Sequence, residues 1–132
     1  MTINQRHVIV PNRSVLDTGT LSVAEMRKSA AYRTAYIGKW PISNHLESSP
    51  MTHGFDYTPA GWERGKPQSY FRHHQNPALE DGLIAKHLTD RLTKEAIGCI
   101  SGQEETEKPY FLCLFYYAVH APFEAKDSLA AK

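Results

Sequence analysis

Two side chains that can carry positive charge follow apolar, strand-like segments of this sequence. Lys39 comes directly after residues 34–38, a β-prone run that stops at a glycine. His120 comes shortly after residues 110–117, eight apolar or aromatic residues in succession. Open α/β sheets bind their ligands outside the carboxyl ends of the strands. Both side chains are therefore candidates for binding an anionic substrate.

The element before Lys39 is predicted to be a helix followed by a strand. Ser22 and Glu25 have the spacing of a capping box, in which each side chain accepts a hydrogen bond from the other residue's backbone amide. Thr20 is a competing cap two residues earlier. We expect a helix over about 22–30 and a strand over 33–38.

A second helix and strand are predicted to precede His120. We expect a helix over 84–101, opened by Asp81 and Gly82, with Asp90 paired to Lys94 on its surface. Its apolar stripe consists of Ile84, Leu88, Leu92, Ala96 and Cys99/Ile100, and Gly102 is its expected stop. The apolar run 110–117 predicts a strand that is buried on both faces. This order of helices and strands is typical of an α/β fold.

Residues 41–82 are predicted to form one long, ordered loop. They hold five of the eight prolines together with several aromatic residues. Long loops in compact domains are commonly functional, and aromatic residues argue against disorder. We expect the loop to pack on a sheet edge, held down by Trp62 and Tyr70, and to line a cleft. Residues 1–19 are poorly defined, although Val8 to Val10 could form a short strand.

Composition excludes several classes of function. The chain has 132 residues, 41% of them hydrophobic and 22% charged, which suits one modest globular domain. The formal net charge of +1 gives no general argument for a nucleic-acid or membrane partner. Arg64, Lys66 and Arg72 could suggest a nucleic-acid surface, but neighbouring acidic residues interrupt them. Two isolated cysteines support neither a disulfide scaffold nor a zinc ribbon. No signal peptide is visible, and neither compartment nor oligomeric state can be assigned.

Simpler interpretations exist for each candidate side chain. Lys39 could be an ordinary surface lysine, and His120 could simply end a strand before Pro122. Histidines 53, 73, 74 and 87 could suggest a metal site. Adjacent side chains point apart, however, and no carboxylate or cysteine completes a ligand set, so these four are expected to be solvated loop histidines.

Several segments together resemble one known family. Residues 32–40 (YRTAYIGKW) resemble the sulfatase signature G-Y-x-T-A-x-I-G-K-W-H-L-G, and residues 53–56 resemble its H-G-F-D. Further similar segments follow in order at 69–71, 76–82, 88–97, 108–112 and 117–122, the last being a strand that ends in H-x-P. The resemblance covers roughly residues 20–125.

The resemblance implies a sulfuric ester hydrolase of the arylsulfatase-like type with an alkaline-phosphatase-like fold. Residues 1–132 would form a single partial catalytic domain, a partial α/β/α sandwich with mainly parallel strands. Lys39 matches the family's sulfate-binding lysine. His120 matches a histidine that contacts sulfate and is a candidate general acid. The resemblance also implies Ca²⁺ as cofactor and a sulfate ester small molecule or sulfated glycan as substrate. Family members are often periplasmic, secreted or lysosomal.

The chain also departs from the family pattern. The family converts a Cys or Ser in C/S-x-P-x-R to a formylglycine nucleophile, and this motif is absent from the sequence. The aspartate and asparagine metal ligands are missing, and Pro41 replaces the histidine of K-W-H. We therefore expect a sulfatase fragment with part of the sulfate site and no turnover of its own. Two alternatives are an inactive sulfatase-like relic or binding protein, and a phosphodiesterase or phosphatase of the same superfamily.

Overall fold

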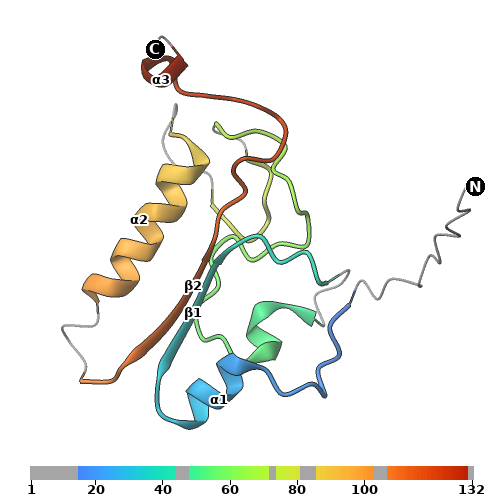
Figure 1. Ribbon diagram of the computed structural model, residues 1–132, viewed down its shortest axis with the longest axis vertical. Helices are drawn as coiled ribbons and strands as arrows, with labels where there is room; N and C mark the ends of the chain where they lie inside the picture. The colour runs from blue at the N-terminus through green and yellow to red at the C-terminus, as the bar shows by residue number, and fades with distance from the viewer. Residues whose placement is uncertain (1–14, 44–47, 72–73, 81–85, 103–106, 131–132) are drawn as a thin grey trace, which may run out of the picture.

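The computed structural model describes residues 15–43, 48–71, 74–80, 86–102 and 107–130. Its elements are, in order, α1 (Val23–Ser29), β1 (Arg33–Gly38), the 3-10 helix η2 (Pro50–His53), α2 (Leu88–Ser101), β2 (Tyr110–Phe115) and α3 (Asp127–Ala130) (Figure 1). The expected short strand at Val8 to Val10 lies outside the described residues. No helix of the described part is both long and apolar enough to cross a membrane.

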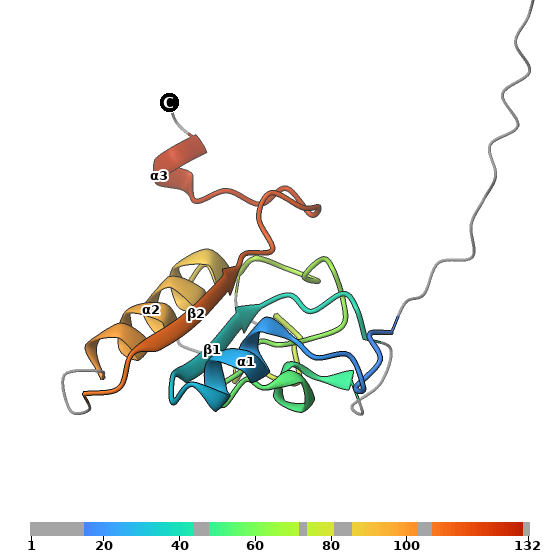
Figure 2. The same cartoon turned by 60° about the horizontal axis from the view of Figure 1, so that its bottom comes forward.

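Strands β1 and β2 pair in parallel and lie between the two longer helices. The register runs from Arg33 opposite Tyr110 to Gly38 opposite Phe115. Figure 2 shows the strand pair with α2 on one side and α1 on the other. A parallel pair needs a crossover connection, and α2 forms part of that connection.

Alternation along β1 divides the core into two clusters. Ile37 packs with Leu88 and Leu92 of α2 in one cluster. Tyr36 packs in the other, with Ala24 of α1 and other buried residues. Because neighbouring side chains of a strand point to opposite faces, the two helices must cover opposite faces of the sheet. The predicted partial α/β/α arrangement with parallel strands is thereby confirmed.

Helix α1 begins where the capping box predicted. The Glu25 amide donates to Ser22 Oγ at 3.1 Å, and the Glu25 carboxylate accepts from the Ser22 amide at 2.7 Å. Ser22 is therefore the N-cap, and the competing cap Thr20 is not. The helix ends at Ser29, and Ala31 has a φ of 64°, which turns the chain toward β1.

Helix α2 begins later than predicted. Residues 81–85 lie outside the described residues, and residues 86–87 are not helical. His87 is the N-cap, with its ring Nδ1 accepting from the Thr89 amide at 3.3 Å. Asp90 pairs with Lys126 rather than with Lys94 as predicted. On the stripe, Leu88, Leu92 and Ala96 are buried, whereas Ile100 is exposed.

Strand β2 differs from the prediction in length and in burial. It ends at Phe115, although Tyr117 beyond it is buried. Tyr110 and Phe115 are 45% and 47% exposed, and the residues between them are partly buried. The expectation of a strand buried on both faces is wrong for the described part, because Leu112 and Leu114 on one face and Phe111 and Cys113 on the other pack only partly against the two core clusters.

The long loop runs along the other edge of β1. Parallel bridges join Ala35 to Tyr57 and Lys39 to Trp62. The Trp40 amide donates to the Trp62 carbonyl at 2.8 Å. Tyr70 is 3% exposed, and Trp62 is half-buried. The expected packing of the loop on a sheet edge is therefore observed, and the loop supplies a third, irregular line of backbone beside the strands.

Candidate anion-binding site

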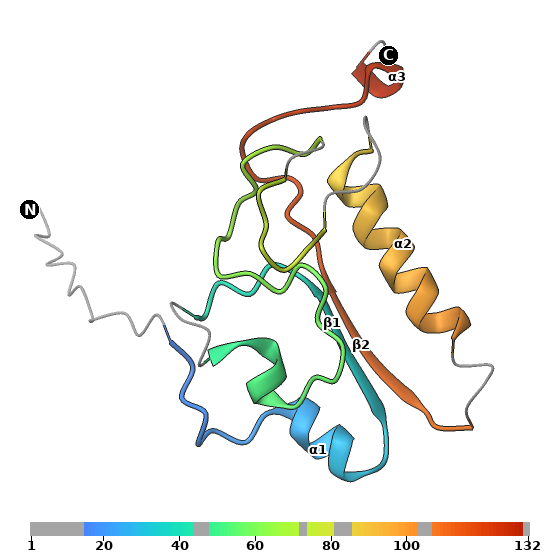
Figure 3. The ribbon, with the colours of Figure 1, turned by 180° about the vertical axis from the view of Figure 1, so that it is seen from behind.

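The carboxyl ends of β1 and β2 lie side by side. Gly38 is opposite Phe115, and the Lys39 amide donates to the Phe115 carbonyl at 3.1 Å. Gly38 has a φ of 112°, and a Cβ atom there would lie 2.6 Å from the Phe115 carbonyl carbon. This close approach brings Lys39 and the segment that leads to His120 out of the sheet at the same end. Figure 3, a view from behind, shows the two segments leaving the sheet at that end.

Lys39 is held through its backbone. Its carbonyl accepts from the Tyr36 hydroxyl at 2.5 Å, and its backbone bridges to Trp62. Burial raises the pKa of Tyr36, so this hydroxyl stays protonated and remains a donor. The side chain is half-buried and pairs with no carboxylate in the described part of the chain. A lysine whose backbone is fixed, and whose charge is not neutralised by a described carboxylate, is available to an anion.

His120 is exposed, and its backbone is fixed by two hydrogen bonds. Its amide donates to the Tyr117 carbonyl at 3.0 Å, and its carbonyl accepts from the Tyr70 hydroxyl at 2.8 Å. The residue lines a cavity of about 420 Å³ together with Tyr70, His87 and Phe123. Among the described residues no hydrogen bond links Lys39 to His120. The two residues follow strands that end side by side at one end of the sheet.

A buried network ties the end of β2 to the long loop. The Tyr117 hydroxyl donates to the Ala60 carbonyl at 3.0 Å. Asn76 Nδ2 donates to the same carbonyl at 3.3 Å and to the Tyr117 hydroxyl at 3.2 Å. Burial raises the pKa of Tyr117, which keeps the hydroxyl protonated. Satisfied buried networks of this kind fix their members rigidly, here just before His120.

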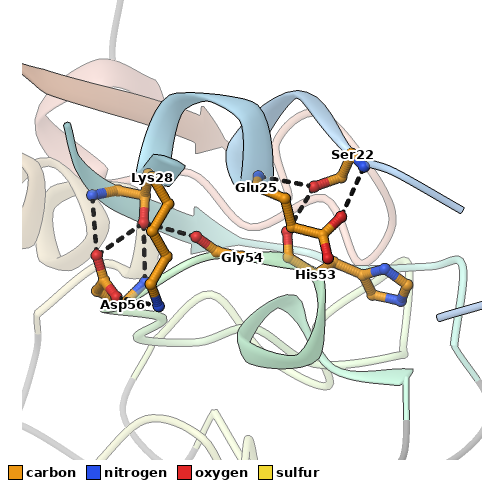
Figure 4. Close-up of polar contacts among 7 residues, drawn as sticks. Ser22, Glu25, Lys28, His53, Gly54 and Asp56 are labelled. Carbon is orange, nitrogen blue, oxygen red and sulfur yellow. Dashed lines mark hydrogen bonds and ion pairs between the residues drawn. The ribbon is translucent and has the colours of Figure 1, made fainter. Parts of the chain in front are cut away.

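The H-G-F-D segment has a structural role. Ser22 Oγ donates to the His53 carbonyl and Thr34 Oγ1 to the Gly54 carbonyl, both at 2.7 Å (Figure 4). Gly54 has a φ of 90°, and a Cβ atom there would lie 2.5 Å from the Glu25 amide nitrogen. The segment therefore joins α1 to β1 at close range, which only glycine at position 54 permits.

Asp56 completes this junction. Its carboxylate pairs with Lys28 at 2.6 Å and accepts from Thr34 Oγ1 at 3.0 Å. The hydrogen bond from Lys28 lowers the pKa of Asp56, against a smaller effect of burial, and the bonds from Thr34 lower it further. Asp56 is thus committed to the packing of α1 on β1.

The prediction of solvated loop histidines is wrong for two of the four. His53 is 0% exposed and His74 is 3% exposed. The His53 ring packs 5.6 Å from the Trp40 ring, and its Nε2 lies 3.1 Å from Ser48 Oγ. His87 caps α2, and His73 lies outside the described residues. The burial of His53 follows from its packing against Trp40, which no local pattern encodes.

The described residues do not fit a calcium site. In this part of the chain no three carboxylate, histidine or cysteine side chains come together. Asp56 is paired with Lys28, Glu25 caps α1, and Glu124 accepts from the Ser69 hydroxyl and the Tyr70 amide. Calcium needs several oxygen ligands around one point, and these carboxylates are used separately.

Neither cysteine has the surroundings of an activated nucleophile. Cys99 and Cys113 are both half-buried beside the core clusters. Burial raises the pKa of both thiols, which disfavours the thiolate. Both residues are therefore core thiols, as their positions in a helix stripe and a strand indicated.

A second cavity of about 470 Å³ lies at the same end of the sheet. It is lined by Arg64, Lys66, Pro67, Gln68, Ala121 and Pro122. From the sequence, Arg64 and Lys66 suggest only a nucleic-acid surface, which the neighbouring acidic residues argue against. Only the fold shows that these two cations lie against the two residues that follow His120.

Comparison with known proteins identifies similar chains. The family model described as Sulfatase matches residues 3–132. N-acetylgalactosamine-6-sulfatase of Mus musculus is 27% identical over 122 residues, covering 76% of this chain and 22% of the relative. Arylsulfatase of Hemicentrotus pulcherrimus is 24% identical over 151 residues, covering 98% and 27%. The chain thus spans about a quarter of the length of these curated relatives.

Solved structures share the fold. The crystal structure of Ps i-CgsB in complex with k-i-k-neocarrahexaose superposes with a TM-score of 0.69 at 23% identity. The match covers 92% of this chain and 31% of that one. A second crystal structure of Ps i-CgsB gives a TM-score of 0.65 at 22% identity over the same shares. The arrangement around β1 and β2 is therefore a part of a larger known architecture.

Proposed function

This chain belongs to the sulfatase family, and we propose that it forms the part of a sulfuric ester hydrolase that binds the sulfate group through Lys39 and His120. The observation that carries the proposal is the parallel register of β1 and β2. Gly38 opposite Phe115 brings both candidate residues to the carboxyl end of the sheet. Ligands of open α/β sheets bind at this end.

The chemistry of the two side chains suits a sulfate ester. The Lys39 ammonium is a point charge on a fixed backbone, it pairs with none of the described carboxylates, and it can hold a sulfate oxygen. His120 is exposed on a turn fixed by Tyr70, and its imidazole can donate a proton to the departing alkoxide oxygen. Preorganised positive charge is worth most where negative charge develops during the reaction.

Binding without turnover is the expected behaviour of this chain alone. The sequence contains no C/S-x-P-x-R motif, so the family's nucleophile is absent from it. The described carboxylates are committed to other contacts, and we assign no calcium to them. Lys39 and His120 would then supply affinity for the sulfate group, while bond cleavage needs groups that these residues do not provide.

The substrate class that we propose is a sulfated saccharide. A relative in mouse carries the name N-acetylgalactosamine-6-sulfatase, and a structural neighbour was solved with k-i-k-neocarrahexaose. Both names contain the name of a carbohydrate. The cavity beside His120 contains the exposed aromatic ring of Phe123, and aromatic faces pack well against sugar rings.

Calorimetry on the purified chain tests this function. We expect N-acetylgalactosamine 6-sulfate to bind, and both Lys39→Ala and His120→Ala to weaken binding by about tenfold, the loss of one charge-assisted contact. Lys94→Ala removes an exposed lysine on α2 and should leave binding unchanged. Equal affinity of the unmodified chain and the three variants would refute the proposed sulfate site. Hydrolysis of an aryl sulfate above the Lys39→Ala background would refute the absence of turnover.

A further inference from the structure

We propose that Arg64 and Lys66 form a second anion subsite, which binds a further sulfate or carboxylate group of a polyanionic glycan. This inference rests on the proposed function, because it extends the substrate beyond the sulfate held by Lys39 and His120. The subsite would make the protein select glycans with several charges over singly charged sulfate esters.

The cavity that contains these two cations has no acidic lining. Its six lining residues include Arg64, Lys66 and the amide of Gln68, and none is a carboxylate. Arg64 and Lys66 are exposed, and neither forms an ion pair with a carboxylate in the described part of the chain. Two positive charges that share one cavity repel each other, and a bound anion would relieve that repulsion.

The cavity adjoins the proposed sulfate site on both sides. Ala121 and Pro122, which form one wall, directly follow His120 in the chain. The other wall follows Trp62, whose backbone bridges to Lys39. A ligand in the cavity would therefore lie between the segments that carry the two sulfate-binding residues. Figure 1 shows the chain after β1 and the chain after β2 leaving the strand pair at the same end.

The Arg64 side chain is positioned before any ligand binds. Its guanidinium carbon lies 4.9 Å from the centre of the Trp62 ring, over the face of the indole. The Trp62 carbonyl in turn accepts from the Trp40 amide at 2.8 Å. Stacking on an aromatic face leaves the edge of a guanidinium free to bind an oxyanion with two hydrogen bonds. Ordering the side chain in advance lowers the entropic cost of binding.

The size of the cavity and the charge of the chain favour a glycan over a nucleic acid. At about 470 Å³ the cavity lies within the range typical of small-ligand pockets, and it is much larger than one sulfate group. A nucleic-acid surface needs positive charge spread along a backbone track. Here the formal net charge is only +1, and Glu63 lies next to Arg64 in the sequence.

The test compares two ligands on the full 132-residue chain by calorimetry. The ligands are N-acetylgalactosamine 6-sulfate, with one charge, and a carrageenan hexasaccharide with several sulfate esters. The double variant Arg64→Ala/Lys66→Ala should weaken binding of the hexasaccharide by at least about tenfold and should weaken the monosaccharide far less. Lys39→Ala should weaken both ligands.

A matched control removes the same charges elsewhere. Arg27 also stacks on an aromatic ring, 5.2 Å from the centre of Tyr32, but it lies on α1, which leads into the opposite end of β1. Lys94 is exposed on α2. Arg27→Ala/Lys94→Ala should leave hexasaccharide binding within about twofold of the unmodified chain, because general electrostatic attraction is then equal in both double variants. Both double variants should show the thermal midpoint of the unmodified chain, since their four changed side chains are exposed.

The outcomes separate this inference from the proposed function. If the two double variants lose hexasaccharide affinity equally, or if the unmodified chain does not bind it, the subsite is refuted. If Arg64→Ala/Lys66→Ala acts selectively while Lys39→Ala has no effect, the subsite stands and the proposed sulfate site fails. An unsulfated oligogalacturonate that binds equally well identifies carboxylate as the second group. An oligonucleotide of similar charge that competes as strongly would overturn the glycan assignment.

Discussion

The backbone of Gly38 packs directly on the carbonyl group of Phe115. The φ of Gly38 is 112°, and a Cβ atom there would lie 2.6 Å from the Phe115 carbonyl carbon. The next residue, Lys39, donates its amide to the oxygen of the same carbonyl at 3.1 Å. One glycine therefore fixes both the end of the strand pairing and the starting point of the candidate site.

Substitution of Gly38 should damage folding and binding together. Gly38→Ala combines a left-handed φ with a collision against backbone, and we expect a loss of about 3 kcal/mol or more in the free energy of unfolding. Urea titration followed by circular dichroism measures the loss. Gly98→Ala is the matched control, because nothing lies within 4 Å of the added methyl group in the middle of α2. It should stabilise by about 0.5–1 kcal/mol. A stable Gly38→Ala variant would contradict the close approach.

The N-cap of α1 can be tested against its neighbour. Ser22→Ala removes the acceptor of the Glu25 amide and the donor to the His53 carbonyl, and it should cost about 1–2 kcal/mol. Thr20→Ala removes an exposed hydroxyl that caps nothing, and its thermal midpoint should match that of the unmodified chain. A lower thermal midpoint in Thr20→Ala than in Ser22→Ala would show that Thr20, and not Ser22, caps the helix.

The junction of α1 and β1 should be sensitive to acid. The pKa of Asp56 is lowered in the folded chain, chiefly by its hydrogen bond with Lys28, so the stabilisation is present above its ordinary value of 3.8. It is lost as the pH falls through the lowered value. The free energy of unfolding should therefore fall between about pH 5 and about pH 2, and Asp56→Asn should flatten that fall. An unchanged pH profile in Asp56→Asn would exclude this carboxylate as the cause.

Part of the acid sensitivity will remain in Asp56→Asn. The pKa of Glu25 is also lowered, first by its backbone hydrogen bond with Ser22. Its contribution has the same sign and is lost over a similar range, because it too is present above the ordinary value of 4.5. Glu25→Gln should therefore remove a further part of the pH dependence.

The hydroxyl of Tyr70 should control the position of His120. Tyr70→Phe keeps the buried ring and removes the bond to the His120 carbonyl, so sulfate affinity should fall by roughly fivefold, about 1 kcal/mol. The control is Tyr57→Phe, which removes a hydroxyl bonded to Glu95 at 2.7 Å and lines a different cavity. It should leave sulfate affinity unchanged. Equal losses in the two variants would show that His120 needs no such anchor.

Features with local signals were predictable from the sequence. Ser22 and Glu25 meet within one turn of helix, and the strand 33–38 follows from side-chain types next to one another. The order of helices and parallel strands also follows, because it depends on periods of a few residues. The positions of Lys39 and His120 beyond the two strands were predictable to the same extent, since each follows an apolar run.

Features that depend on distant contacts were not predictable. The start of α2 is tied to the long loop by the Leu88 amide, which donates to the Tyr70 carbonyl at 2.6 Å. The burial of His53 depends on the Trp40 ring above it. Arg64 and Lys66 form a cavity only together with Ala121 and its neighbour, and Ala121 lies more than fifty residues further along the chain. No window of the sequence contains both partners of these contacts.

Strand β1 is covered on both faces and paired on both edges, which has a consequence for its tolerance to mutation. Ile37 belongs to the cluster with α2, whereas Tyr36 belongs to the cluster with α1, and the long loop and β2 occupy the two edges. Every direction around this strand is thus occupied by a different part of the molecule. In a scan of all substitutions, residues 34–38 should be the least permissive segment, and compensating changes should arise in different elements for odd and even positions.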